Sequence, residues 1–202
     1  MMDHGKKGQF FFELPYWQHN LLRHNLDVMH IEKSIVDSIL GTLLDISGKT
    51  NDHEKARYDL KVMGIRKNLH PQDTKDSKRT KFTKSCFSMT NGEKSNFCGV
   101  LKTANLPDGS ASNISRCVHL DERKVSNYKT HDAHFMLHYL LPIPIKSILP
   151  DHVAIPLICL SSFFHRLCQK VITLEELDCL EVEIIETVNK LERIFLLNFL
   201  IS

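Results

Sequence analysis

DVMHIEKSIVDSILGTLLDI, residues 27–46, carries the clearest secondary-structure signal in the sequence. Its apolar residues recur at intervals of three and four, which places them on one face of a helix: Ile35, Val36, Ile39, Leu40, Leu43 and Leu44. Gly48 follows the last of them, and a glycine commonly lies just beyond the end of a helix. This stretch therefore predicts an amphipathic helix.

Other capping signals predict a mainly α fold. A side-chain acceptor followed three residues later by glutamate, the capping-box pattern, occurs at Asn51/Glu54, Thr90/Glu93 and Thr173/Glu176. Asp151 is expected to be a further N-cap, and Gly64 is expected to end the helix that Asn51 opens. Two strand-like runs, 117–120 and 125–128, predict a small β-hairpin near 115–128.

The C-terminal part is expected to be helical from residue 131 onward. Its last helix carries a narrow apolar stripe with alternating spacings of three and four: Leu177, Leu180, Ile184, Val188, Leu191 and Phe195. Such a stripe is suited to packing on another helix. The segment 153–171 is the expected partner.

Composition restricts the classes of function. The 202 residues are 42% hydrophobic with a net charge of +2, so an ordinary core is possible and no strong whole-chain attraction to nucleic acid or membrane is expected. No G-x-G-x-x-G, G-x-x-x-x-G-K-[ST], G-x-S-x-G or H-E-x-x-H pattern occurs. The commonest nucleotide-binding, serine-hydrolase and zinc-protease signatures are therefore missing.

Targeting signals are also missing from the sequence. The N-terminal apolar run, Phe10 to Phe12, is too short for a signal peptide, so secretion is not expected. No apolar run approaches the ~18 residues that span a bilayer, so no membrane partner is expected. The six cysteines form no C-x-x-C pair and are interpreted as reduced thiols.

A polar, basic segment spans residues 66–84 and is predicted to be an exposed linker. Its cations, Lys75, Lys78, Arg79, Lys81 and Lys84, are the candidate DNA-binding residues because they are suited to contact phosphates. The alternative is a solvated linker without a ligand. Phe82 is the one aromatic residue among these cations, and aromatic side chains are what stack on bases.

A series of short strings then carries a resemblance that spans nearly the whole chain. They are LPYW (14–17), RHNLDVMHIEK (23–33), GKT (48–50), KAR (55–57), LPDGSASNISRC (106–117), HDAH (131–134), LLPI (140–143) and KLERIF (190–195). Their order and spacing resemble those of plant CACTA (En/Spm-like) transposases. The part from about residue 131 resembles a domain of unknown function that follows the transposase segment in that family.

The resemblance implies a fragment of a larger RNase H-like enzyme. Such a parent cuts and joins transposon-end DNA with three carboxylates that hold two divalent ions. By resemblance, the first two carboxylates precede this segment and the third follows it, so the chain is expected to be a non-catalytic remnant. Residues 1–130 would be transposase-derived, and residues 131–202 would be a helical C-terminal domain cut short, since 196–199 read LLNF where the family usually has a proline pair.

The resemblance also implies partners and a location. The parent would act on DNA in the nucleus. The alternative function is a small helical protein–protein interaction module derived from a transposon, which would pair with a transposase copy or another protein through the C-terminal helix.

Asp27-x-x-His30 matches a D-x-x-H pattern of the resembled family, and His131-x-x-His134 offers a second pair of donors at the same spacing. Side chains at i and i+3 share a helix face, so each pair can chelate, and four donors complete a tetrahedral zinc site. Asp27, His30, His131 and His134 are therefore the candidate metal ligands, and zinc is the candidate cofactor. The alternative is that Asp27 caps a helix, His30 fills a polar core position, and the other two histidines decorate the start of a helix.

Overall fold

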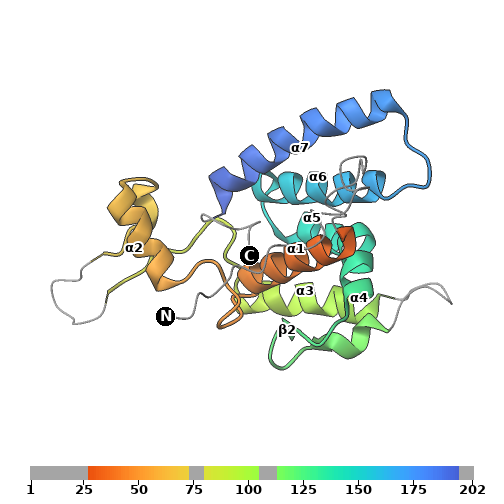
Figure 1. The fold of residues 1–202 in the computed structure, drawn as a ribbon. Helices are drawn as coiled ribbons and strands as arrows, with labels where there is room; N and C mark the ends of the chain where they lie inside the picture. The colour runs from red at the N-terminus through yellow and green to blue at the C-terminus, as the bar shows by residue number, and fades with distance from the viewer. Residues whose placement is uncertain (1–26, 73–79, 105–112, 196–202) are drawn as a thin grey trace, which may run out of the picture.

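Helix α1, Val28–Leu43, confirms the first predicted helix and lies at the centre of the fold (Figure 1). The computed structural model describes residues 27–72, 80–104 and 113–195. Asp27 is the N-cap, and its carboxylate accepts a hydrogen bond from the backbone N–H of His30 at 3.2 Å. One of the four free amides at the helix start is thereby satisfied.

Helix α2, Glu54–Met63, ends at Gly64 as predicted, in the left-handed conformation with φ of 68°. Its N-cap is His53, so the prediction of Asn51 was wrong: the His53 ring nitrogen Nδ1 accepts from the backbone N–H of Ala56 at 3.1 Å. Asn51 is held elsewhere, because its backbone N–H donates to the hydroxyl of Thr42 at the end of α1. The short 3-10 turn η3, Lys67–Leu69, packs against α2.

The capping box of Thr90 and Glu93 begins helix α3, Asn91–Thr103, as predicted. After the 3-10 turn η4, Ile114–Cys117, the strands β1, Val118–His119, and β2, Lys124–Val125, pair antiparallel. Val118 lies opposite Val125 in this pair, and both are buried. The predicted hairpin near 115–128 is confirmed.

The C-terminal part is helical, as expected. Its elements are α4 (Thr130–Phe135), η5 (Met136–Leu140), α5 (Pro142–Ile148), α6 (Asp151–Leu167) and α7 (Leu174–Ile194). Thr173 caps α7 in a capping box with Glu176, which confirms that prediction. Asp151 is the first residue of α6 and Pro150 precedes it as the N-cap, so the predicted cap was wrong by one residue.

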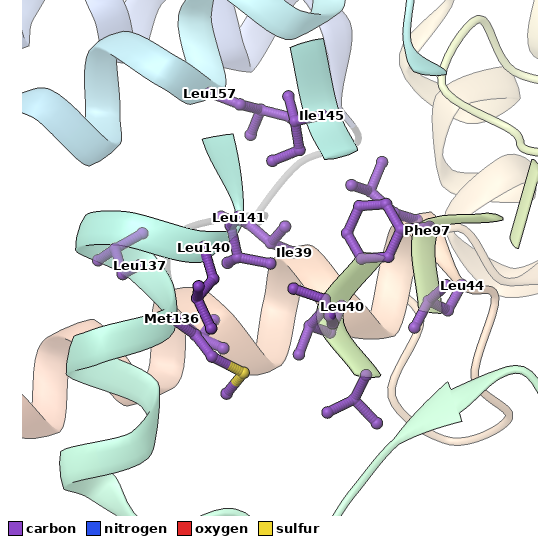
Figure 2. Close-up of a cluster of buried hydrophobic side chains, with 14 of the residues drawn as sticks. Ile39, Leu40, Leu44, Phe97, Met136, Leu137, Leu140, Leu141, Ile145 and Leu157 are labelled. Carbon is purple, nitrogen blue, oxygen red and sulfur yellow. The ribbon is translucent and has the colours of Figure 1, made fainter. Parts of the chain in front are cut away.

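One hydrophobic core joins these helices. In Figure 2, Ile39 and Leu40 of α1 lie near Phe97 of α3 and near Leu141, which precedes α5. Ile145 of α5 lies beside Leu157 of α6 in the same view. The same cluster extends to Phe195, at the end of α7. Residues on both sides of position 130 therefore share one core. The domain boundary predicted at this position stays a prediction.

Helix α7 packs along α6, the partner predicted for it (Figure 1). Leu180, Leu191 and Phe195 of the predicted stripe are buried, whereas Leu177 is 43% exposed. Most of the stripe is thus occupied by contacts within the chain.

The described residues confirm the mainly α fold with one small hairpin. They give no support to the RNase H-like part of the prediction, since the sheet found among them is the two-stranded β1–β2 pair. Within the same ranges, no helix has both the length and the apolar character needed to cross a membrane.

Candidate functional site

The four residues predicted to bind metal do not converge in the structure. Among the described residues, the group of donors that meets consists of Glu32, His134, His138 and Cys168. His134 is its only member from the predicted set. His30 and His131 are exposed, and Asp27 is occupied in capping α1. The reason is helix geometry, because two residues separated by two positions, such as His30 and Glu32, point about 200° apart.

Glu32 is the centre of the cluster and is fully buried. Its Oε2 lies 2.5 Å from Nδ1 of His134, and its Oε1 lies 2.7 Å from Nε2 of His138. The thiol of Cys168 donates to Oε1 with a sulfur–oxygen distance of 3.6 Å. One ligand atom from each of the four residues lies within 4.8 Å of every other.

Three separate parts of the chain position these side chains. Helix α1 carries Glu32 and packs against α4 and η5. His134 and His138 are four residues apart, so they lie on one face of the continuous helix formed by α4 and η5. Cys168 is the C-cap residue of α6, where its backbone N–H donates to the carbonyl of Phe164 at 3.0 Å.

The turn that contains His138 has an unusual backbone. Met136–Leu140 forms a π-helical turn, in which the backbone N–H of Leu141 donates to the carbonyl of Met136 at 2.9 Å. Single π-helical turns inside α-helices are rare and are frequently found at functional sites. The turn coincides with the donor cluster.

Burial and hydrogen bonding act in opposite directions on Glu32. Burial alone would raise the pKa of its carboxyl, but the hydrogen bonds with His138 and His134 outweigh that effect and lower it. Burial and the neighbouring Glu32 raise the pKa of the Cys168 thiol. Around neutral pH the cluster thus contains a buried carboxylate next to a protonated thiol. A buried charge is costly unless it is paired, and here the imidazoles supply the pairing.

Exposure differs across the cluster. The side chain of His138 is 3% exposed and that of His134 is 28% exposed. Cys168 is exposed. A small ion can therefore reach the buried carboxylate from the side of His134 and Cys168. A carboxylate, two imidazoles and a thiol are the donor types that zinc binds in proteins.

The sequence contained part of the signal for this site. In HDAHFMLH, residues 131–138, the i, i+4 pair His134/His138 offers one helix face just as His131/His134 does, but no family pattern drew attention to it. Glu32 sits between Ile31 and Lys33 like an ordinary surface residue. Cys168 follows the end of α6, three positions after His165, and only the fold brings it to Glu32 and the two histidines.

The candidate DNA-binding residues are only partly covered. Lys81 and Lys84 are exposed, whereas Lys75, Lys78 and Arg79 lie outside the described residues. The backbone N–H of Gln72 donates to the carbonyl of Lys81 and the reverse bond also forms, each at 3.0 Å. The parts of the basic segment on either side of the undescribed residues 73–79 therefore lie side by side at this point. A cleft of about 260 Å³ next to Lys84 is also lined by Asp45, so its charge is mixed.

No family model, curated protein or solved structure matches the chain. The cluster is therefore interpreted from its own geometry. The resemblance to CACTA transposases remains a hypothesis. Its string at 14–17, residues 23–26 of the string at 23–33, residues 106–112 of the string at 106–117 and the divergent 196–199 lie outside the described residues.

Proposed function

We propose that the chain is a non-catalytic helical segment of a CACTA-type transposase, whose parent would cut and join transposon-end DNA. One observation supports the proposal: the described part of the string at 23–33 contacts the string at 131–134. Glu32 from the first and His134 from the second are in contact although they are 102 positions apart. Strings that meet at a buried carboxylate have a shared structural role that a simple linker would not require.

In this proposal the segment supports catalysis without supplying its carboxylates. By resemblance, the segment lies between the second and third catalytic carboxylates of an RNase H-like parent. A helical body with its own core is suited to hold the flanking parts in place. Its contribution to strand cleavage is positional, because metal-ion catalysis requires the full carboxylate set in one site.

The first test uses the isolated chain. Incubation with transposon-end DNA and Mg²⁺ or Mn²⁺ is expected to yield no nicking and no strand transfer. Cleavage that disappears on substitution of a residue within this chain would contradict the proposal.

A second test asks for the positional role directly. Residues 27–195 replace the corresponding segment of an intact CACTA transposase, and excision of a reporter element is measured. Excision is expected to persist with the unsubstituted segment and to fall when the segment carries Glu32→Ala. The control variant Asp151→Asn, which alters an exposed ion pair, should leave excision unchanged. Loss of excision with the unsubstituted segment would count against the proposal.

The alternative function is a protein-interaction module. Its binding surface would be a different face of α7 from the one predicted. The predicted stripe packs on α6, but Leu174, Val182 and Ile185 are 78%, 60% and 56% exposed. Light scattering of the purified chain separates the two: concentration-dependent association that Val182→Asp abolishes would favour the interaction module.

A further inference from the structure

We propose that Glu32, His134, His138 and Cys168 bind one zinc ion in a structural site that joins α1, the α4–η5 helix and the end of α6. This inference goes beyond the proposed function and holds whether or not the chain derives from a transposase. It rests on the positions and chemistry of the four donors.

The four donor atoms lie close enough together to share one ion. Zinc bonds of about 2.0–2.3 Å place the ligand atoms of a tetrahedral site about 3.3–3.8 Å apart. Here Oε2 of Glu32 lies 2.5 Å from Nδ1 of His134, and Oε1 lies 2.7 Å from Nε2 of His138 and 3.6 Å from the sulfur of Cys168. One ligand atom from each of the four residues lies within 4.8 Å of every other. Binding an ion therefore requires the carboxylate and the two rings to move apart by less than about 1.5 Å.

The donor set selects among metals. Thiolate and imidazole favour a borderline or soft ion over Mg²⁺ or Ca²⁺, which prefer oxygen ligands. Two histidines and one carboxylate alone resemble the triad of non-haem iron sites, where open positions accept other ligands. Cys168 supplies a fourth donor here. Four protein ligands close a tetrahedron, which is typical of a structural zinc site.

Zinc also balances the charge of a buried cluster. The ion carries two positive charges, and the Glu32 carboxylate and the Cys168 thiolate carry one negative charge each, while both imidazoles are neutral. Binding forms a Zn–S bond and releases the Cys168 thiol proton to solvent. A neutral complex thereby replaces a buried carboxylate whose present partners are two imidazoles and a thiol.

The site joins segments far apart in the sequence. Glu32 is separated from His134 by 102 positions and from Cys168 by 136. An ion that binds all three segments in the folded chain, but not in the unfolded chain, shifts the equilibrium toward the fold.

The test measures zinc on the full chain under reducing conditions. After treatment with a chelator, the protein is titrated with zinc in competition with a coloured indicator, and bound metal is counted by mass spectrometry. One zinc per chain is expected. Cys168→Ser and His138→Ala should each weaken binding by at least about tenfold to a hundredfold, the loss already seen when outer-shell partners of metal ligands are replaced.

Two matched controls lie beside the ligands. His131→Ala and His30→Ala remove exposed histidines near the site, and both variants should retain full zinc affinity. Zinc should also raise the Tm of the wild-type chain and of both controls, with little effect on Cys168→Ser. This pattern distinguishes the site from adventitious binding by any of the twelve histidines.

Cobalt provides a readout that does not depend on a variant folding. Co²⁺ bound to the wild-type chain is expected to show the intense visible absorption of a tetrahedral site and a thiolate-to-cobalt charge-transfer band. Absence of that band, absence of bound zinc, or equal loss of zinc in His131→Ala and His138→Ala would overturn the proposal. No DNA is present in these measurements, so their failure is independent of a failure of the transposase proposal.

Discussion

Arg57 is 5% exposed, and its guanidinium joins α2 to the chain on both sides. Nη2 donates to Asp52 at 2.6 Å and to the hydroxyl of Ser85 at 2.7 Å, and Nη1 donates to the carbonyl of Leu69 at 3.2 Å. The Ser85 hydroxyl donates in turn to Asp52 at 2.6 Å. Asp52 is the only anion in this network, so Asp52→Ala leaves a buried cation without its counter-charge.

The free energy lost with Asp52→Ala is expected to be large compared with the local stability of α2. Removing one partner of a buried ion pair costs about 3–5 kcal/mol. The apolar cluster under α2 consists of Leu60 and Leu69, with Ala56 packed against it, and is separate from the main core. Burial of two leucines contributes about 3–6 kcal/mol at about 1.5–3 kcal/mol each. The substitution therefore removes about as much free energy as this cluster provides, and α2 with η3 should open locally.

Hydrogen exchange followed by mass spectrometry checks this prediction. Amides in 54–69 should exchange faster by roughly two to three and a half orders of magnitude, since about 1.4 kcal/mol corresponds to a factor of ten. Amides in α3 and α6 should keep their protection because they belong to the main core. Asp151→Asn is the control, since its ion pair with Lys146 is exposed and such pairs contribute little to stability. Unchanged exchange in 54–69, or an equal increase in α3, would refute the reasoning.

Three further predictions concern other parts of the fold. Gly41→Ala should lower the free energy of unfolding by about 1–3 kcal/mol in urea titration, because an added Cβ would lie 2.5 Å from the backbone carbonyl oxygen of Lys49. Burial would raise the pKa of the Asp37 carboxyl, but hydrogen bonds, led by the one from Lys33, lower it. The ionised carboxylate therefore stabilises the fold fully above about pH 5, and this stabilisation is lost as pH falls through the lowered pKa. The difference in free energy of unfolding between wild type and Asp37→Asn should shrink over the same pH range. Limited proteolysis should cut first within 66–84, and early cleavage throughout 131–195 would contradict that expectation.

Local signals predicted most of the helices because the residues that specify a helix end lie next to it. Thr90 and Thr173 each form a capping box with a glutamate three residues away, and both were identified from that spacing. The prediction for Asn51 was wrong because the N-cap of α2 lies two residues later, at His53, while the backbone of Asn51 is bonded to Thr42, nine positions earlier. A side chain's local preference cannot reveal such a bond.

The sequence alone determined the mainly α fold, the hairpin and the packing of α7 on α6, because apolar periodicity records which face of each element is buried. It also identified His134 as a donor. Only the tertiary structure decided that His134 meets Glu32, His138 and Cys168, since these come from three segments whose relative rotation depends on packing between helices. A rotation of α1 by about half a turn would bring His30 to the cluster in place of Glu32. The burial of Ile35, Val36 and Ile39 in the core prevents that rotation, and this packing selects the cluster that forms.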